Sequence, residues 1–415
     1  MRILLSISAL LMTVFLVQTG IGSMGPLAAL SAISYGFTPF EIGLIGAAHF
    51  FGFIGGCFLT PFLLFRVSHS RAFSAMAGLA VISVLLHPIL DHAIAWMVLR
   101  IFIGFSVAGS YTAIESWLNS KLTNKNRSRF FSIYKMIDLA GALLSQALII
   151  SLMPGHYISF SIIAIVICLS FLPLALTTSV PPDIEVPTRI RPFLALNISP
   201  LAAIGAVIVG ATSAAVRMVG PVFGYESNFS AQDIGIFLML FILGGAVAQI
   251  PVGFLAEYIS KRRLIVFLSL LTAVSSMAIQ AFSQNLTSIA NPIFILISLF
   301  GATTIPLYSL CATHANDLAD SDDYTDLSAS LILFFGIGAI TSPIITSLII
   351  DRFGPNAMFT FFAALHVGMV LFALYRTRMR PGLPFVSSYI YIPRTTLLIT
   401  ARLRRQRINK SRGKK

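Results

Sequence analysis

Ionisable side chains interrupt three long apolar stretches of this sequence, where they could carry protons or hold a charged solute. Arg100 and Glu115 lie in one stretch, Lys135 and Asp138 in the next, and Arg217 in a third. An ionised group inside a bilayer costs roughly 2.5–3.5 kcal/mol on insertion scales, so it usually faces a cavity or an opposite charge. We therefore interpret these residues, Glu115 apart, as candidates for a polar path through the interior. The alternative is that these charges pair across helices and only hold the bundle together.

Spacing adds detail to this interpretation. Lys135 and Asp138 are three residues apart and therefore neighbours on one helix face. Arg100 and Glu115 lie near opposite ends of their stretch, about 22 Å apart at 1.5 Å per residue. Arg100 is the one nearer the outer end, and we expect it to act in coupling or gating.

A helix face is defined by Arg100 and the residues that follow it at helical spacing, namely Gly104, Ala108, Tyr111, Glu115 and Asn119. The small side chains on this face let another helix approach closely. Glu115 and Asn119 fall at its inner end, where we expect them to form a gate opposite His314 and Asp317. A loop anchor is the alternative for this pair.

The composition shows what must position these groups. The chain has 415 residues, of which 57% are hydrophobic and only 10% charged. An average soluble domain carries about 25% charged residues, so this chain could not cover a water-facing surface. In a bilayer only helices or closed barrels satisfy every backbone polar group. The apolar runs are near twenty residues long and do not alternate, which predicts an all-α membrane protein.

Other chemistries find little support in the residues. Cys57, Cys168 and Cys311 are far apart and predict neither a metal cluster nor a disulfide framework. No phosphate loop or zinc-binding helix motif occurs, so we expect no enzyme and no cofactor. His49 and His366 lie in apolar runs and could carry protons near neutral pH, although hydrogen-bonded structural histidines are more common.

Twelve apolar runs fill the chain and divide it into four segments. We predict a six-helix bundle at 1–178, a linker rich in proline at 179–198, a second six-helix bundle at 199–376 and a basic tail at 377–415. The first run could be mistaken for a secretory signal, but its apolar character continues past Leu30.

Basic residues predict the orientation. Most of the 28 lysines and arginines fall on one side if both termini are cytoplasmic, as the positive-inside rule requires. The net charge of +13 therefore reflects topology in the inner membrane and gives no reason to expect nucleic acid. The tail is expected to rest on anionic lipid, and a regulatory or partner-binding role for it stays open. The acidic stretch 314–326 would then be cytoplasmic, as a conformational latch or a solvated turn.

Two halves of the chain repeat. The matching segments are 38–44 with 230–236, 25–27 with 220–222, and 141–145 with 338–342, at offsets of 192, 195 and 197 residues. The first pair carries a hydroxyl at the N-cap and an acid three residues later, which is a capping box. Parallel repeats of six helices imply a solute site near the midplane between the halves.

A loop signature then suggests a family. Gly253, Glu257, Lys261 and Arg262 show a glycine, an acid four residues on, and then basic residues. This spacing resembles a loop signature of the major facilitator superfamily. Arg100, Gly104 and Ala108, each four residues after the last, resemble the motif of that family in the fourth span. The copy of this loop signature in the first half lacks both the glycine and the acid. The resemblance therefore implies a lock formed by charged residues of the loop only in the second half.

Further segments resemble the YcaD-like branch of that superfamily: 114–119, 126–134, 314–317 and 336–340. The resemblance implies a twelve-span fold in two pseudo-symmetric bundles and transport of a solute, without indicating which solute. Our leading hypothesis is a monomeric secondary transporter that exports a small organic molecule in exchange for protons by alternating access. Uptake or facilitated diffusion is the first alternative, and a non-transporting membrane sensor or scaffold is the second.

Overall fold

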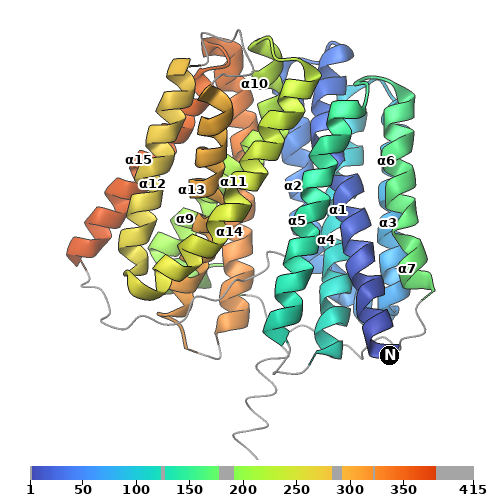
Figure 1. Cartoon of the computed structure of the whole chain (residues 1–415), viewed down its shortest axis with the longest axis horizontal. Helices are drawn as coiled ribbons and strands as arrows, with labels where there is room; N and C mark the ends of the chain where they lie inside the picture. The colour runs from blue at the N-terminus through green and yellow to red at the C-terminus, as the bar shows by residue number, and fades with distance from the viewer. Residues whose placement is uncertain (1, 123–126, 177–190, 283–291, 321–322, 380–415) are drawn as a thin grey trace, which may run out of the picture.

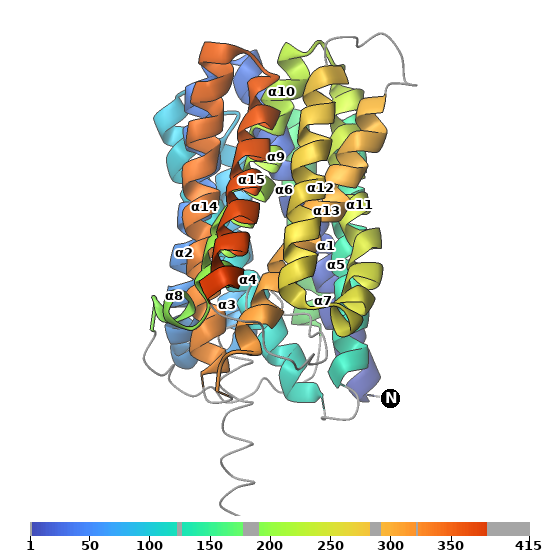
Figure 2. The same ribbon diagram turned by 90° about the vertical axis from the view of Figure 1, so that its left-hand side faces the viewer.

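The structure is a computed structural model that describes residues 2–122, 127–176, 191–282, 292–320 and 323–379. This described part is helical, and twelve of its helices are long and apolar enough to cross a membrane (Figures 1 and 2). The predicted all-α membrane fold with twelve spans is therefore confirmed. Of the predicted linker, residues 179–190 lie outside the described residues, as do 380–415 of the predicted tail.

The first half contains seven helical segments: α1 (Arg2–Ser34), α2 (Pro39–Arg66), α3 (His69–Leu86), α4 (Ala93–Lys121), α5 (Arg127–Ser151), α6 (Tyr157–Leu169) and α7 (Phe171–Ala175). The second half contains eight: α8 (Leu194–Ile198), α9 (Pro200–Met218), α10 (Gly220–Glu226), α11 (Ala231–Tyr258), α12 (Lys261–Phe282), α13 (Pro292–Asn316), α14 (Tyr324–Phe353) and α15 (Ala357–Met379). We call the end of the bundle at which α1 begins the N-terminal face, and the other end the opposite face.

The predicted capping boxes are present at the start of α2 and of α11. The Thr38 hydroxyl accepts a hydrogen bond from the Glu41 amide, and the Glu41 carboxylate accepts one from the Thr38 amide. Ser230 and Asp233 repeat the arrangement. Both boxes satisfy amides that have no partner inside the helix, so they define where each helix begins on the opposite face.

The two halves pair their helices in the same way. In the first half α2 packs on α4, α1 on α5, α3 on α4, α3 on α6 and α1 on α6. The counterparts in the second half are α11 on α13, α9 on α14, α12 on α13, α12 on α15 and α9 on α15. The contacts between the halves are also paired, since α2 packs on α14 and α5 packs on α11. This correspondence confirms two pseudo-symmetric bundles.

Glycines set the closest helix crossings, and they repeat at the offsets found in the sequence. A Cβ atom at Gly104 would lie 1.9 Å from the carbonyl oxygen of His49, so α4 touches the backbone of α2 there. Gly301 lies 197 residues later and makes the same approach to the carbonyl oxygen of Phe241 on α11. Equivalent positions in α4 and α13 can therefore be matched residue by residue.

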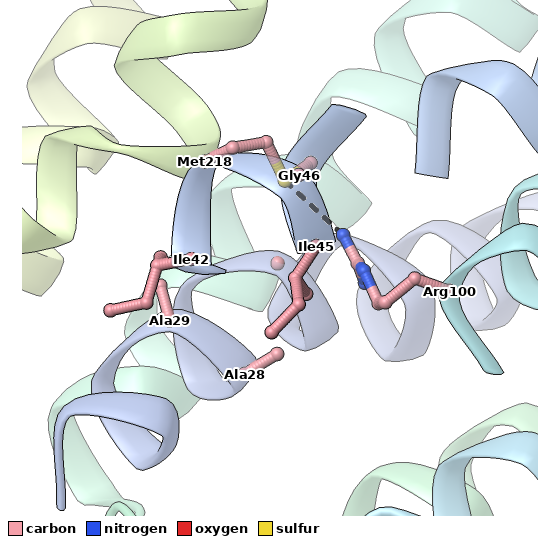
Figure 3. A pocket seen from close by; sticks show the side chains of 8 residues that line it. Ala28, Ala29, Ile42, Ile45, Gly46, Arg100 and Met218 are labelled. Carbon is pink, nitrogen blue, oxygen red and sulfur yellow. Dashed lines mark hydrogen bonds between the residues drawn. The ribbon is translucent and has the colours of Figure 1, made fainter. Parts of the chain in front are cut away.

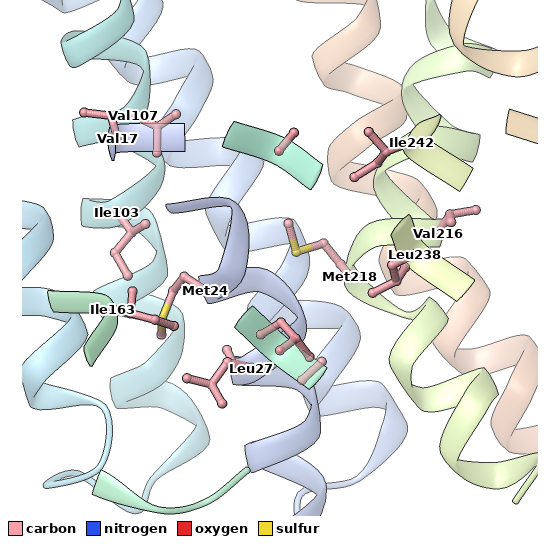
Figure 4. Packing of buried hydrophobic residues seen from close by; sticks show 14 of the residues in the cluster. Val17, Met24, Leu27, Ile103, Val107, Ile163, Val216, Met218, Leu238 and Ile242 are labelled. Carbon is pink, nitrogen blue, oxygen red and sulfur yellow. The ribbon is translucent and has the colours of Figure 1, made fainter. Parts of the chain in front are cut away.

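The largest apolar cluster connects the halves toward the opposite face, and a small cluster of Cys57, Ala108 and Ile332 connects them deeper in the bundle. One cluster of buried side chains includes Leu27 and Ile45 of the first half together with Met218, Leu238 and Phe359 of the second (Figure 4). A second cluster, toward the N-terminal face, has core members from the second half alone. The described conformation is consequently closed at the opposite face.

Two predicted spans are interrupted. The sixth ends as α6 at Leu169 and resumes as α7 after Ser170, whose hydroxyl donates to the carbonyl oxygen of Ile167 at 2.6 Å. The seventh divides at Val219 into α9 and α10, directly before a glycine–proline pair. Proline has no amide hydrogen to continue the ladder of the preceding turn, which accounts for the second interruption.

Candidate functional site

Asp138 of α5 is the centre of a polar cluster inside the first half. Its Oδ2 accepts a hydrogen bond from Lys135 Nζ at 2.6 Å, which confirms that these two residues are neighbours. Its Oδ1 lies 2.8 Å from the hydroxyl of Tyr111 on α4. The same hydroxyl is also hydrogen-bonded to Gln18 of α1. The Tyr111 hydroxyl thus joins three helices, and 13% of the Asp138 side chain and 44% of the Lys135 side chain are exposed.

A second carboxylate lies in the same interior. Glu115 of α4 is 2% exposed and accepts a hydrogen bond from the hydroxyl of Tyr134 at 2.7 Å. Its charge acts on Tyr111, as does that of Asp138, so both carboxylates lie within electrostatic range of one phenol. A carboxylate that is hydrogen-bonded to a tyrosine can take up and pass on a proton, because the hydroxyl both donates and accepts.

The second half lacks this chemistry at the matching positions. At the offset of 197 residues, apolar side chains stand in place of Arg100, Glu115, Lys135 and Asp138: Ile297, Ala312, Ile332 and Phe335. Tyr111 corresponds to Tyr308, whose ring packs edge-on against Phe335 at a centroid distance of 5.4 Å. The helical architecture is therefore built without these charges in one half, so they are not required simply to assemble it.

Arg100 lies in α4 toward the opposite face and is 1% exposed. Its Nη2 is 3.2 Å from the sulfur of Met218, at the end of α9 in the other half (Figure 3). The guanidinium borders a small hollow whose other walls come from α1, α2 and α9: Gly25, Ala28, Ala29, Ile42, Ile45, Gly46 and Met218. Arg100 thus reaches across the contact between the halves.

Arg217 and His49 lie in the same region. The charges of Arg100 and Arg217 both act on the imidazole of His49, which packs against the ring of Phe50. Arg217 also lies within electrostatic range of Tyr111, which belongs to the polar cluster around Asp138. His366 lies elsewhere, in α15, where its Nε2 is 3.2 Å from the hydroxyl of Thr212.

The loop signature of the second half forms an ion pair. Lys261, at the start of α12, donates to Oδ2 of Asp317 at 2.6 Å, just after the end of α13. Gly253 is buried at the end of α11, whereas Glu257 is exposed. The charges of Lys261, Arg262 and Asp317 all act on His314, which is 8% exposed.

Two residues of the predicted gate have hydrogen-bond partners within their own halves. Glu115 is bound to Tyr134 within the first half, and Asp317 to Lys261 within the second. The backbone of Asn119 belongs to α4, but its side chain lies outside the described residues. Residues that meet only when the N-terminal face closes would stay apart in a conformation closed at the opposite face.

Three participants were not predicted as site residues. Gln18 is a polar side chain within the first apolar run, a signal that could have singled it out. Tyr134 directly precedes Lys135 in the sequence, and this position beside a charged residue could have singled it out. Met218 is an ordinary apolar residue, and nothing in the sequence distinguishes it from the other methionines.

Comparisons with known proteins agree with this architecture. The sequence profile described as Major Facilitator Superfamily matches residues 10–202 and again 201–408. The MFS-type transporter YcaD of Escherichia fergusonii is 23% identical over 343 residues, covering 81% of this chain and 87% of the relative. YcaD of Salmonella arizonae is 23% identical and covers 91% of this chain and 97% of the relative.

Solved structures share the fold at low identity. The nucleoside transporter NupG (D323A mutant) superposes with a TM-score of 0.79 at 12% identity, covering 89% of this chain and 99% of that one. A bacterial homologue of the human lysosomal transporter Spinster, in an inward-facing and occupied conformation, gives a TM-score of 0.74 at 15% identity and covers 91% and 98%. A D-xylose–proton symporter gives 0.65 at 13%, covering 95% and 98%.

Proposed function

We propose, from the premise that this chain belongs to the major facilitator superfamily, that it couples the movement of its small solute to protons. Membership makes the chain an integral membrane transporter of a small solute. The coupling rests on one observation, namely that two carboxylates, each hydrogen-bonded to a tyrosine, lie in the first half and are replaced by Ala312 and Phe335 in the second.

Asp138 is the proton-binding group in this proposal. Its two oxygens contact Lys135 and Tyr111, so a proton on Asp138 would weaken the ion pair and release the ammonium. Glu115, linked to Tyr134, offers a second acid for relay. A change of partners of this kind ties protonation to helix position, because Asp138 and Tyr111 belong to different helices.

We propose export as the direction and a cytoplasmic N-terminal face. The bundle is closed at the opposite face, and in an exporter this conformation would receive solute from the N-terminal side. The basic residues support a cytoplasmic assignment for that side. Glu115, Asn119, His314 and Asp317 would approach one another when this face closes, and Lys261 would then hold Asp317 in position.

Purified protein in liposomes that contain a pH-sensitive dye tests the coupling. A panel of sugars, amino acids, organic acids and amphipathic drugs should include one class that moves protons with the wild type. Asp138→Asn should abolish this proton movement. Asp233→Asn is the matched control, since it alters a partly exposed carboxylate at a helix cap and should leave the flux intact.

The outcomes separate the hypotheses. Loss of proton movement in Asp138→Asn, with wild-type behaviour of Asp233→Asn, supports coupling. Solute flux that is equal in wild type and Asp138→Asn, and insensitive to a pH gradient, would contradict it and favour facilitated diffusion. The sign of the proton movement on adding solute outside distinguishes proton symport, the mechanism of the uptake alternative, from proton exchange, the mechanism proposed for export.

A further inference from the structure

Arg100 is a buried cation without a carboxylate. Only 1% of the residue is exposed, and no ion pair joins its guanidinium to any acid in the described part of the chain. Its Nη2 contacts only the sulfur of Met218, and its Nε has no hydrogen-bond partner. A guanidinium has five donors in a planar fork that suits carboxylate and phosphate oxygens, so the present environment leaves most of its binding capacity unused.

A second arginine, Arg217, lies in the same region as Arg100. Arg217 and Arg100 both act on His49, and the acids Glu115 and Asp138 lie closer to the other end of the first half. In the second half, the position matching Arg100 holds Ile297. The arginine is therefore neither neutralised locally nor demanded by the repeated helix packing.

Glycines create the space beside the guanidinium. A Cβ atom at Gly25 would lie 3.3 Å from Met218 Cε and 3.9 Å from Arg100 Nη2, and one at Gly46 would lie 2.8 Å from Met218 Cβ. Figure 3 shows the guanidinium directed at the methionine sulfur across this hollow. The thioether closes the hollow from the second half, so separating the halves at the opposite face would uncover the arginine.

We infer that Arg100 is the recognition point for an oxyanion group of the transported solute, a carboxylate or a phosphate, in the state that is open at the opposite face. This inference rests on the proposed transport function and specifies its substrate class. Met218 occupies the arginine in the closed state and is replaced by the anion in the open one. In an exporter this contact is the last before release, and in an importer it is the first.

A ligand that binds only the open state must stabilise that state. The test uses full-length protein in phosphatidylcholine nanodiscs, with acetate, benzoate, citrate, inorganic phosphate and glycerol phosphate as probes. Benzamide and glycerol are the neutral counterparts. Calorimetric titration measures Kd, and the midpoint of thermal unfolding provides a second readout, since a ligand of the native state raises Tm.

One oxyanion class should bind, and its neutral counterpart should not. Arg100→Gln should weaken the Kd of that anion by about tenfold or more, and Arg100→Lys should weaken it less, because lysine keeps the charge but loses the fork. Without ligand, Arg100→Gln should unfold at the same temperature as wild type or a higher one, since an unpaired buried charge is removed. Arg352→Gln, an exposed arginine of α14, is the control and should bind normally.

Oxyanions that fail to bind, or that bind Arg100→Gln as tightly as wild type, would overturn the inference. Binding that vanishes in phosphatidylglycerol nanodiscs would assign the site to a lipid headgroup and would also overturn it. The proposed coupling is judged separately with Asp138→Asn, which should lose proton movement while keeping the Kd for the anion. Proton-linked flux of neutral solutes alone would contradict the inference and leave the proposed function standing.

Discussion

The hydroxyl of Tyr111 connects three helices. The second half of the chain has a tyrosine at the matching position, Tyr308, which serves as a control. Tyr111 and Tyr308 occupy matching positions, but the first faces Asp138 and the second packs on the ring of Phe335. The phenol oxygen therefore has a carboxylate to organise in one half only. Its removal should have different consequences at the two sites.

We predict that Tyr111→Phe lowers proton-linked flux by about tenfold or more, because a hydrogen bond to a charged group contributes roughly 1.5–3 kcal/mol. Tyr308→Phe keeps the ring contact with Phe335 and should retain flux within about threefold of wild type. Initial rates in the liposome assay measure both. Equal losses in the two variants would show that the hydroxyl of Tyr111 has no special part in coupling.

His87, at the end of α3 on the opposite face, predicts a pH dependence of stability. Its ring lies between Trp96 and Phe160, at centroid distances of 5.0 and 6.0 Å, and its Nδ1 is 2.7 Å from the carbonyl oxygen of Ser83. Burial lowers the pKa of His87 from 6.5 to about 3, outweighing the opposite effect of the hydrogen bond to Ser83. The folded protein therefore binds fewer protons here than the unfolded chain between these two pH values.

Stability should consequently fall as the pH drops below 6.5, by about 2 kcal/mol at pH 5 from this residue. The midpoint of thermal unfolding, recorded from pH 8 to pH 5, measures this loss of stability. His87→Phe should flatten the curve over this interval, and His92→Gln, at an exposed position, should not. An unchanged slope in His87→Phe would assign the pH dependence to other residues.

For individual residues, the sequence predicted the contacts that spacing along one helix determines. Lys135 and Asp138 are three residues apart, so their ion pair follows from helix geometry alone. The contacts of Asp138 with Tyr111 and of Arg100 with Met218 join residues on different helices. Such contacts depend on the rotation of each helix about its axis, which the apolar pattern of a membrane span leaves poorly determined.

Among the elements, the crossing of α2 and α4 is the closest contact inside the first half. A Cβ atom at Gly104 would approach a backbone oxygen to 1.9 Å, and backbone cannot move aside as a flexible side chain can. In a membrane the helices associate through close packing, since lipid offers no hydrophobic drive between them. Gly104 therefore allows α2 and α4 to pack as closely as they do.

Gly104→Ala should destabilise the protein by about 1–3 kcal/mol or more, as expected for an overpacked interior. Gly78→Ala is the matched control on α3, because no atom lies within 4 Å of its Cβ position. That control should be neutral or stabilising by about 0.5–1 kcal/mol, since alanine favours helix. Thermal unfolding in detergent measures both variants, and equal stability of the two would refute the packing argument.

Hydropathy predicted the order and type of the elements, but it did not mark their interruptions. Capping signals at Thr38 and Ser230 marked where α2 and α11 begin. The break between α6 and α7 at Ser170 lies in an apolar run that reads as continuous. Its signal is Pro173, which has no amide hydrogen to donate to the carbonyl oxygen of Leu169, four residues earlier.

For the whole molecule, the sequence predicted two repeated bundles but not which face is closed. Both states of an alternating-access protein share one set of helices and one hydropathy pattern. The structure distinguishes them because the largest core cluster crosses between the halves toward the opposite face. Close approaches there, such as that of Gly235 to Ile150 on α5, hold the halves together.

Gly43 offers a way to force the halves apart. A Cβ atom at this position of α2 would lie 2.2 Å from the hydroxyl of Ser347 and 2.6 Å from the carbonyl oxygen of Pro343, both on α14. Gly43→Leu should therefore act as a wedge that disfavours the state closed at the opposite face. Gly55→Leu lies on the same helix, where the nearest atom is 4.0 Å from the Cβ position, and should not.

A cysteine in place of Ala29, which lines the hollow beside Arg100, reports the opening. With exposed Cys168 changed to serine, the buried Cys57 and Cys311 remain as native thiols. An impermeant maleimide applied from the opposite face should label Ala29→Cys several-fold faster in Gly43→Leu than in Gly55→Leu. This follows because a wedge destabilises one of two states and so raises the population of the other. Equal labelling would mean that the contact of α2 with α14 at Gly43 does not hold this face closed.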